Sequence, residues 1–103
     1  MAWEGPITPS EANVVVGAAS TLLAAANADR RWLLIANRSD EMVDVKLGEA
    51  AVAGEGIPIN PIDASNNIQG VFESSEKNCN LYKGAVYGIC ASGGKTVSVY
   101  QGS

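Results

Sequence analysis

The chain has 103 residues, of which 47% are hydrophobic and 17% charged, and its formal net charge is −4. This apolar content excludes an intrinsically disordered protein, and the length fits a single domain. The basic residues are scattered apart from Arg30-Arg31, which argues against a nucleic-acid partner, because phosphate binding requires a basic patch. The longest apolar run, residues 14–26, is interrupted and shorter than the roughly 20 residues that cross a bilayer, so no membrane partner is expected.

The opening segment, residues 1–12, shows no apolar period. Trp3, Pro6, Ile7 and Pro9 lie there among polar residues, and each proline fixes φ and lacks an N–H donor. The sequence therefore predicts an extended N-terminal arm, 1–12, followed by a folded domain, 13–103. Trp3 either caps its own domain or reaches a neighbouring subunit, where aromatic anchors often contribute much of the binding energy. The opening also lacks a basic and apolar leader, so secretion is not indicated.

The first half of the domain predicts four strands. Residues 13–18 form one. Residues 20–28 are ambiguous, because alanine favours helix and Ser20 or Thr21 could cap it, but nine residues are few for a helix. The turn residues that follow favour a strand. Residues 31–37 are apolar on both faces, as in a central strand. Residues 42–47 alternate, which places Val43, Val45 and Leu47 inward.

The second half predicts further short strands and a closing hairpin. Residues 57–62 contain two prolines and therefore form an edge strand at best. Residues 68–73 form another strand with Gly70 as a bulge, and residues 74–80 an exposed polar loop. Residues 85–91 and 95–101 flank Ser92-Gly93-Gly94 and predict a hairpin. The whole pattern is typical of an all-β chain: a single antiparallel β-sandwich or jelly-roll-like barrel of about seven or eight short strands.

The residue inventory offers no reaction centre. The chain has no histidine, which removes the Ser–His and Cys–His nucleophile systems and the commonest metal ligand. Cys79 and Cys90 alone cannot supply a four-ligand zinc site, and either a disulfide or two reduced packed thiols is compatible with their spacing. We therefore predict no catalytic, cofactor-binding or metal-binding residue, and a protein that is not an enzyme.

Two groups of side chains remain as candidates for binding. Arg30 and Arg31 flank a predicted turn, where they pair with acidic groups of a partner or are simply solvated. Tyr82, Tyr87 and Tyr100 form a stacking surface for a sugar or a protein, or serve as ordinary strand residues.

Three segments carry a resemblance to a known family: TLLAAANADRRWLLIANRS, VDVKLGEAAVAGEGIPI and GAVYGICASGGKTVSVYQG. The first segment contains a strand that begins with an arginine and ends near a serine. The second contains a glycine-rich loop and the third a glycine turn close to the end of the chain. They resemble small β-sandwich virion proteins of tailed bacteriophages over residues 20–102, and the chain departs from that pattern at Pro61-Ile62-Asp63. The matching positions are Arg31, Asn37, Ser39, Leu47, Gly48, Ala51, Gly54, Gly56, Ile57, Gly84, Ala85, Gly88, Ile89, Ser92, Gly93, Gly94, Val97 and Val99.

This resemblance implies a structural protein of the phage particle. Within that class we expect a capsid decoration or cement protein, made in the host cytoplasm and bound to the outer capsid surface across subunits of the major capsid protein. It also implies a homo-oligomer, a trimer by analogy. The alternatives are a tail, baseplate or fibre-associated component, and a carbohydrate-binding β-sandwich module that uses Trp3, Tyr82 or Tyr87 as a sugar platform. The expected interface residues are Trp3, Pro6, Ile7, Pro9, Arg30 and Arg31.

Overall fold

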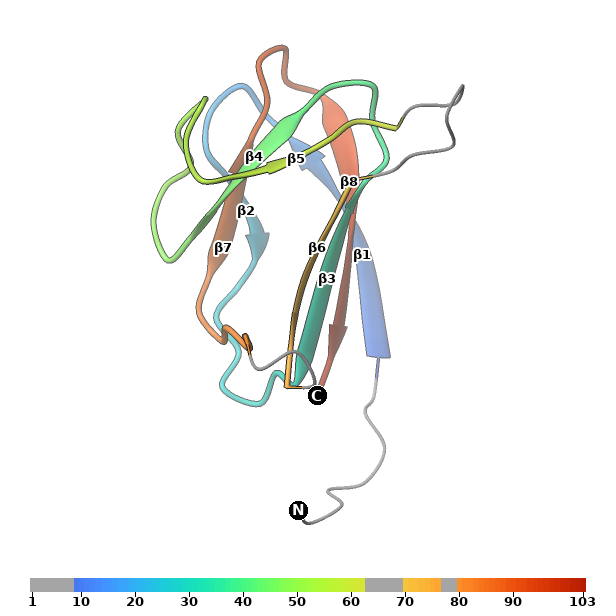
Figure 1. Cartoon of the computed structure of the whole chain (residues 1–103), viewed down its shortest axis with the longest axis vertical. Coiled ribbons are helices and arrows are strands. Elements are labelled where there is room, and N and C mark those ends of the chain that lie inside the picture. Colours follow the sequence, from blue (N-terminus) through green and yellow to red (C-terminus); the bar gives the residue numbers. More distant parts are fainter. Residues whose placement is uncertain (1–8, 63–69, 77–79) are drawn as a thin grey trace.

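The computed structural model describes residues 9–62, 70–76 and 80–103, and these form two facing antiparallel sheets (Figure 1). Sheet A has the strand order β1-β8-β3-β6 and sheet B the order β2-β7-β4-β5. The predicted all-β sandwich is therefore confirmed. The strands are β1 Pro9–Val16, β2 Thr21–Ala24, β3 Trp32–Asn37, β4 Val43–Leu47, β5 Ile57–Ile59, β6 Val71–Ser75, β7 Val86–Ile89 and β8 Lys95–Gly102.

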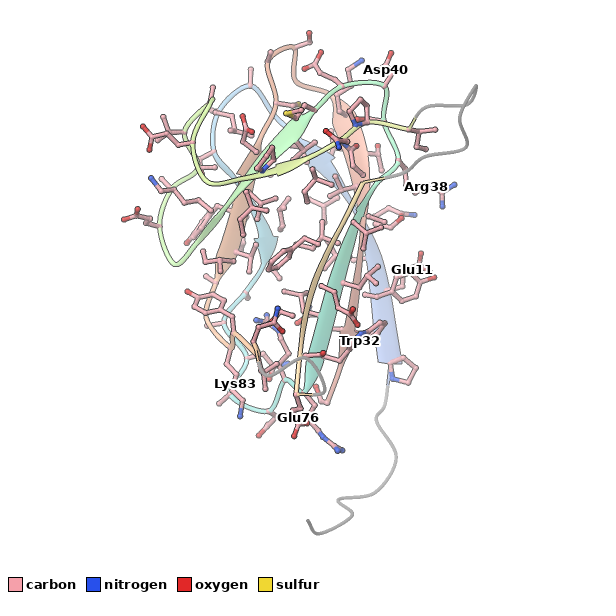
Figure 2. All side chains as sticks on the ribbon, viewed as in Figure 1. Glu11, Trp32, Arg38, Asp40, Glu76 and Lys83 are labelled. Atoms are coloured by element: carbon pink, nitrogen blue, oxygen red, sulfur yellow. The ribbon has the colours of Figure 1, made fainter. Side chains whose placement is uncertain are left out.

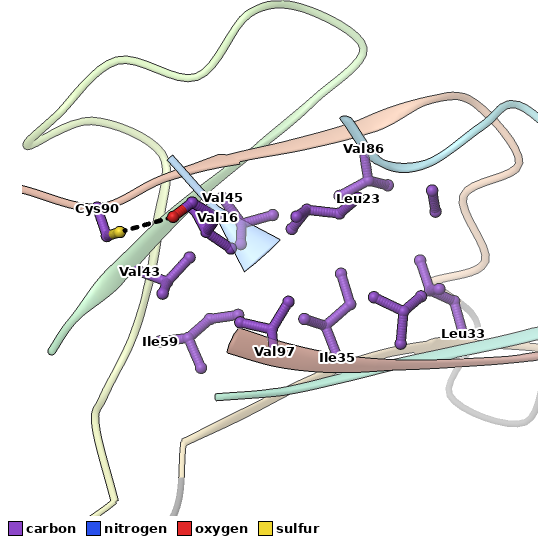
Figure 3. Packing of buried hydrophobic residues seen from close by; sticks show 12 residues of the cluster. Val16, Leu23, Leu33, Ile35, Val43, Val45, Ile59, Val86, Cys90 and Val97 are labelled. Carbon is purple, nitrogen blue, oxygen red and sulfur yellow. Dashed lines mark hydrogen bonds between the residues drawn. The ribbon is translucent and has the colours of Figure 1, made fainter. Parts of the chain in front are cut away.

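The core lies between the sheets and consists mainly of branched aliphatic side chains (Figure 3). The alternation in β4 predicted it correctly, since Val43 and Val45 are fully buried and Leu47 packs against the cluster. Because side chains of a strand point alternately to opposite faces, every second residue reaches this space. The buried members are Val16, Leu23, Ala24, Leu33, Ile35, Val43, Val45, Ile59, Val86, Cys90, Val97 and Val99.

The predicted closing hairpin is wrong. β7 pairs with β2 and β4 in sheet B, whereas β8 pairs with β1 and β3 in sheet A. The connection between them crosses from one sheet to the other. Its glycines do take the positive φ values that the turn was expected to need, 71° at Gly93 and 67° at Gly94. Apolar alternation reveals which face of a strand is buried, but it does not reveal which strand lies beside it.

The first strand begins earlier than expected. Residues 9–12, assigned to the arm, belong to β1, where Pro9 pairs with Gly102 and Ala12 with Val99. These residues are exposed and largely polar, so their main-chain pairing leaves no apolar period in the sequence. Residues 20–28, the ambiguous segment, contain strand β2, and β5 lies at a sheet edge as predicted.

The expected polar loop 74–80 begins inside β6. Ser74 and Ser75 end that strand and are buried. The Ser74 hydroxyl donates to the Asn80 carbonyl oxygen at 3.0 Å and accepts from the Tyr82 N–H at 2.7 Å. The small Ser74 side chain thus fits the interior because the neighbouring backbone satisfies its hydroxyl. Gly70 lies before the strand, not at a bulge within it.

Candidate interaction surface

The structure describes three of the six residues predicted to form an interface, namely Pro9, Arg30 and Arg31. Trp3, Pro6 and Ile7 lie outside the described residues, and Pro9 is exposed at the start of β1. The other two are adjacent arginines with opposite environments. Arg31 pairs with Glu76 at 2.7 Å near the surface, whereas Arg30 is entirely buried. The assignment of Arg30 to a solvated or partner-facing turn is therefore wrong.

Arg30 joins four segments of the sandwich. Its Nε donates to Gln101 Oε1 at 2.9 Å, and Nη1 donates to the carbonyl oxygens of Tyr82 and Gly84, each at 3.0 Å. Nη2 donates to the Ala25 carbonyl oxygen at 2.7 Å. Burial lowers the pKa of the guanidinium, and these acceptors compensate part of its lost hydration. Arg30 is thus a structural residue.

Asn37 and Ser39 form a second polar cluster at the other end of β3. Asn37 Nδ2 donates to the carbonyl oxygens of Glu41 at 2.8 Å and Ile59 at 3.0 Å. Its Oδ1 accepts from the Ser39 N–H at 3.0 Å and the Ser39 hydroxyl at 2.7 Å. The buried amide therefore fixes the turn after β3 and attaches it to β5. Asn37 and Ser39 are two of the positions on which the resemblance to phage proteins rests, and in this structure they fix the backbone of the turn.

The glycine-rich loop has an equally structural basis. Gly48, Gly54 and Gly56 adopt φ values of 82°, 82° and 83°, a region that favours glycine. At Gly56 a Cβ atom would also collide with the Val45 carbonyl oxygen. Ser20 from the β1–β2 connection accepts a hydrogen bond from the Ala51 N–H at 2.8 Å. The loop is therefore held against the sandwich by backbone geometry, by the Ser20 hydroxyl and by the Asp44 carboxylate.

The tyrosines do not gather into one platform. Tyr82 packs against the core, Tyr87 lies on β7 in sheet B, and Tyr100 lies on β8 in sheet A. Sequence reasoning missed the aromatic pair that does form. Trp32 on β3 lies beside Tyr100, with ring centroids 6.3 Å apart and planes tilted by 49°. Only the β3–β8 register brings these two residues together, and neither local pattern contains that information.

Trp32 lies on the outer face of sheet A (Figure 2), and the strand register places Tyr100 on the same face. The register places Glu11, Tyr100, Leu34 and Glu73 in one row across the four strands. Trp32 Nε1 donates to Glu73 Oε2 at 3.1 Å, and a hydrogen bond to the Glu11 carboxylate raises the pKa of Tyr100. Both aromatic rings are thus oriented by carboxylates.

Exposed apolar side chains extend this surface. Val15 on β1 is 61% exposed and Val71 on β6 is 52% exposed, and both point to the outer face. We call this surface the A face. It comprises Glu11, Asn13 and Val15 of β1, Trp32 and Leu34 of β3, Val71 and Glu73 of β6, and Thr96 and Tyr100 of β8.

Asp40, Glu41 and Asp44 make local contacts. Lys95 Nζ lies 2.8 Å from Asp40 Oδ1, and Glu41 accepts from the Ser92 N–H at 2.7 Å and the Ser92 hydroxyl at 2.8 Å. The lysine lowers the pKa of Asp40, and the Ser92 donors lower the pKa of Glu41. Asp44 accepts from the Gly54 N–H at 2.9 Å.

Within the described ranges, no group of three or more cysteine, aspartate or glutamate side chains is arranged to hold a metal ion. Cys90 is a buried free thiol that donates to the Val16 carbonyl oxygen at 3.3 Å, and Cys79 lies outside the described residues. The same part of the chain contains no helix long and apolar enough to span a membrane.

Comparison with known proteins gives no relative: no family model, curated protein or solved structure matches this chain.

Proposed function

We propose that this chain is a non-enzymatic structural virion protein that decorates and stabilises a phage capsid by binding across subunits of the major capsid protein. The observation that carries the proposal is the A face. Aromatic side chains flanked by charged groups are typical of protein interfaces. Exposed apolar patches on a folded domain mark interaction sites.

The choice of a phage particle as the partner rests on the sequence resemblance over residues 20–102. Its shared positions include Asn37, Ser39, Gly56 and the Gly93-Gly94 turn, which have structural roles in this sandwich. The likeness therefore concerns the fold, and it supports the proposal that this chain uses the same kind of small β-sandwich domain for attachment.

The proposed attachment uses many copies of a modest contact. The A face supplies the anchor through Trp32 and Tyr100, and residues 1–8, which precede β1, add the contacts expected of Trp3, Pro6 and Ile7. Repeated weak contacts on one lattice sum by avidity. Under this proposal the protein is made in the host cytoplasm and binds the outer capsid surface, with the major capsid protein as its partner.

A charge introduced into the A face tests the proposal. We expect Val71→Lys to reduce the number of copies bound to purified particles by at least tenfold, because a lysine would have to be desolvated at the contact. Val52→Lys is the matched control, since Val52 is 45% exposed but lies after β4, in the loop before β5 of sheet B. It should bind like the unmodified protein.

Cryo-electron microscopy of the particle locates the chain directly. Hundreds of copies on the shell support the decoration role, whereas a few to tens of copies at the tail would support the tail, baseplate or fibre alternative. Absence of the chain from the shell, or equal binding by both lysine variants, would overturn the proposal.

One observation also favours the carbohydrate-binding alternative. Trp32 and Tyr100 supply aromatic rings beside the carboxylates of Glu11 and Glu73, a combination that accepts both the apolar faces and the hydroxyls of a sugar. The platform would then be this pair instead of Trp3, Tyr82 or Tyr87. Binding of the isolated domain on a glycan array, lost in Trp32→Ala and kept in Tyr87→Ala, would favour this function.

A further inference from the structure

The four edge strands of the sandwich differ in how their free main-chain groups are protected. An unprotected edge is a template for another strand, and proteins shield edges with prolines, irregularities or short strands. In sheet B, β5 has three residues and contains Pro58. β2 has four residues and a register shift between Leu22 and Ala24. Both edges of sheet B are therefore poor templates.

In sheet A, the edge of β6 is occupied by Asn80. The side chain of Asn80 donates from Nδ2 to the Glu73 carbonyl oxygen and accepts at Oδ1 from the Ser75 N–H, both at 3.0 Å. The Asn80 N–H also donates to the Ser75 carbonyl oxygen at 3.4 Å. A single asparagine thus takes the place of a neighbouring strand.

The remaining edge, β1, has eight residues, and among the described strands it pairs only with β8. In an antiparallel strand, the N–H and C=O of one residue point to the same side, and the side alternates along the chain. The Gly17 carbonyl, directly after β1, points away from β8, because it accepts from the Cys90 N–H at 3.1 Å. Counting back by twos places the main-chain groups of Val15, Asn13 and Glu11 on the outer edge.

The opposite side of sheet A gives the same alternation. Asn37 donates to the Gly70 carbonyl oxygen on the β6 side, which leaves Ala36 and its partner Ser98 bonded to each other. Val97 therefore bonds to Val14 on β1. Among the described residues, the outward main-chain groups of Glu11, Asn13 and Val15 have no hydrogen-bond partner.

We infer that this edge binds a second copy of the same chain, with the two β1 strands antiparallel and the two-fold axis at Asn13. In this register Asn13 bonds to Asn13 of the second copy, and Glu11 bonds to Val15 of the second copy. All three outward residues are then paired. Sheet A becomes one continuous eight-stranded sheet across the dimer.

Charge and chemistry select this register over its neighbours. Centring the pair on Glu11 would set two carboxylates opposite each other, which is destabilising. Centring it on Val15 would oppose Asn13 to Gly17, whose carbonyl is already taken by Cys90. Pro9 has no N–H to donate, so the pairing between the two β1 strands ends at Pro9.

Two side chains also benefit in the chosen register. Val15, 61% exposed, is covered by the aliphatic part of Glu11 from the second copy. The Asn13 Oδ1 accepts from the Ser98 hydroxyl at 3.0 Å, which leaves its Nδ2 directed to donate across the axis. The dimer would also join two A faces into one unit, so attachment to any lattice becomes bivalent.

Sedimentation equilibrium of the purified protein tests the dimer without any particle. We expect a reversible monomer–dimer equilibrium, and at least a tenfold weaker association for Val15→Pro, because proline removes an outward N–H that makes no bond to β8. Val15→Thr keeps the N–H and should associate like the unmodified chain. Thermal unfolding monitors that both variants stay folded. A monomer at millimolar concentration, a trimer, or a proline variant that is folded and still dimeric would overturn the inference.

Cross-linking tests the register. Paired residues in an antiparallel ladder have Cα atoms about 5.5 Å apart, within reach of a disulfide. Asn13→Cys should give a covalent dimer on mild oxidation, whereas Val71→Cys, on the same face at the opposite edge, should give little. Equal cross-linking by both variants contradicts the register. Both readouts use the free protein, so they fail separately from the capsid proposal.

Discussion

Sheet A contains two strands of eight residues, β1 and β8, whereas the strands of sheet B have three to five. Long strands are positioned by many main-chain hydrogen bonds to their neighbours. The short strands of sheet B depend more on their connections, where the glycine-rich loop and the Arg30 and Asn37 clusters fix the chain. Structural specificity is thus concentrated in the connections between strands, at both ends of β3 and in the glycine-rich loop.

This contrast separates residues that determine the fold from residues available to a partner. The outer side chains of sheet A lie outside the buried core, and they include exposed apolar groups such as Val15, Val71 and Tyr100. The positions on which the proposed resemblance to phage virion proteins rests lie mainly in the connections and the core. A chain can therefore keep the same core and connections while the side chains of the A face change. For this reason the fold alone does not identify the partner.

The largest loss of stability is expected from Arg30→Met, which tests a residue that determines the fold. The substitution removes four hydrogen bonds from a buried guanidinium and leaves their acceptors unsatisfied. We expect a loss of about 3–5 kcal/mol in the free energy of unfolding, measured with urea.

Arg31→Met is the control for Arg30→Met. Its ion pair with Glu76 is partly exposed, so its removal should cost less than about 1 kcal/mol. Equal losses for the two neighbouring arginines would mean that the buried cluster does not hold the ends of the sheets together.

The next largest effect is expected in the glycine-rich loop. Gly56→Ala combines an unfavourable positive φ with a collision against the Val45 carbonyl oxygen, and we expect it to lower the free energy of unfolding by about 2–4 kcal/mol. Gly54→Ala has the same φ but no atom within 4 Å of the new Cβ. It should cost about 1–2 kcal/mol. A difference of zero between them would show that the loop moves freely away from β4.

Whether the sequence predicted a feature of the structure depends on how far apart in the sequence the interacting residues lie. Alternation in residues 42–47 is a local signal, and it predicted β4 and its buried face correctly. The closing hairpin failed because β7 and β8 find their partners elsewhere in the chain. The prediction that Arg30 is solvated or faces a partner failed for a related reason. Three of its hydrogen-bond acceptors, on Tyr82, Gly84 and Gln101, are more than 50 residues away in the sequence. The A face depends on strand register and was likewise beyond local patterns.

Acid should weaken the contact that Glu41 makes with Ser92, which links the β3–β4 connection to the β7–β8 connection. Hydrogen bonds from Ser92 lower the pKa of Glu41 below its ordinary value of 4.5. The folded state therefore favours the carboxylate, so this contribution is complete above pH 4.5 and is lost as the pH falls through the folded pKa. The stability of Glu41→Gln should decline less steeply on the acid side.

Nuclear magnetic resonance titration of Glu41 provides the direct measurement. The pKa of the Glu41 carboxyl should lie below 4.5 in the unmodified protein and should rise in Ser92→Ala, which keeps the N–H donor but lacks the hydroxyl. An unchanged pKa in that variant would assign the whole effect to the Ser92 N–H.

The smallest expected effect on stability is on the A face itself. Val97 and Val71 lie on opposite faces of sheet A, one fully buried and one 52% exposed. Val97→Thr should cost about 1–3 kcal/mol, because it buries a hydroxyl, whereas Val71→Thr should change the free energy of unfolding by less than about 0.5 kcal/mol. If thermal and urea unfolding show Val71→Thr to be neutral while attachment to the particle weakens, the apolar character of this face serves a partner and not the fold. A loss comparable to that of Val97→Thr would instead make the A face part of the stabilising framework.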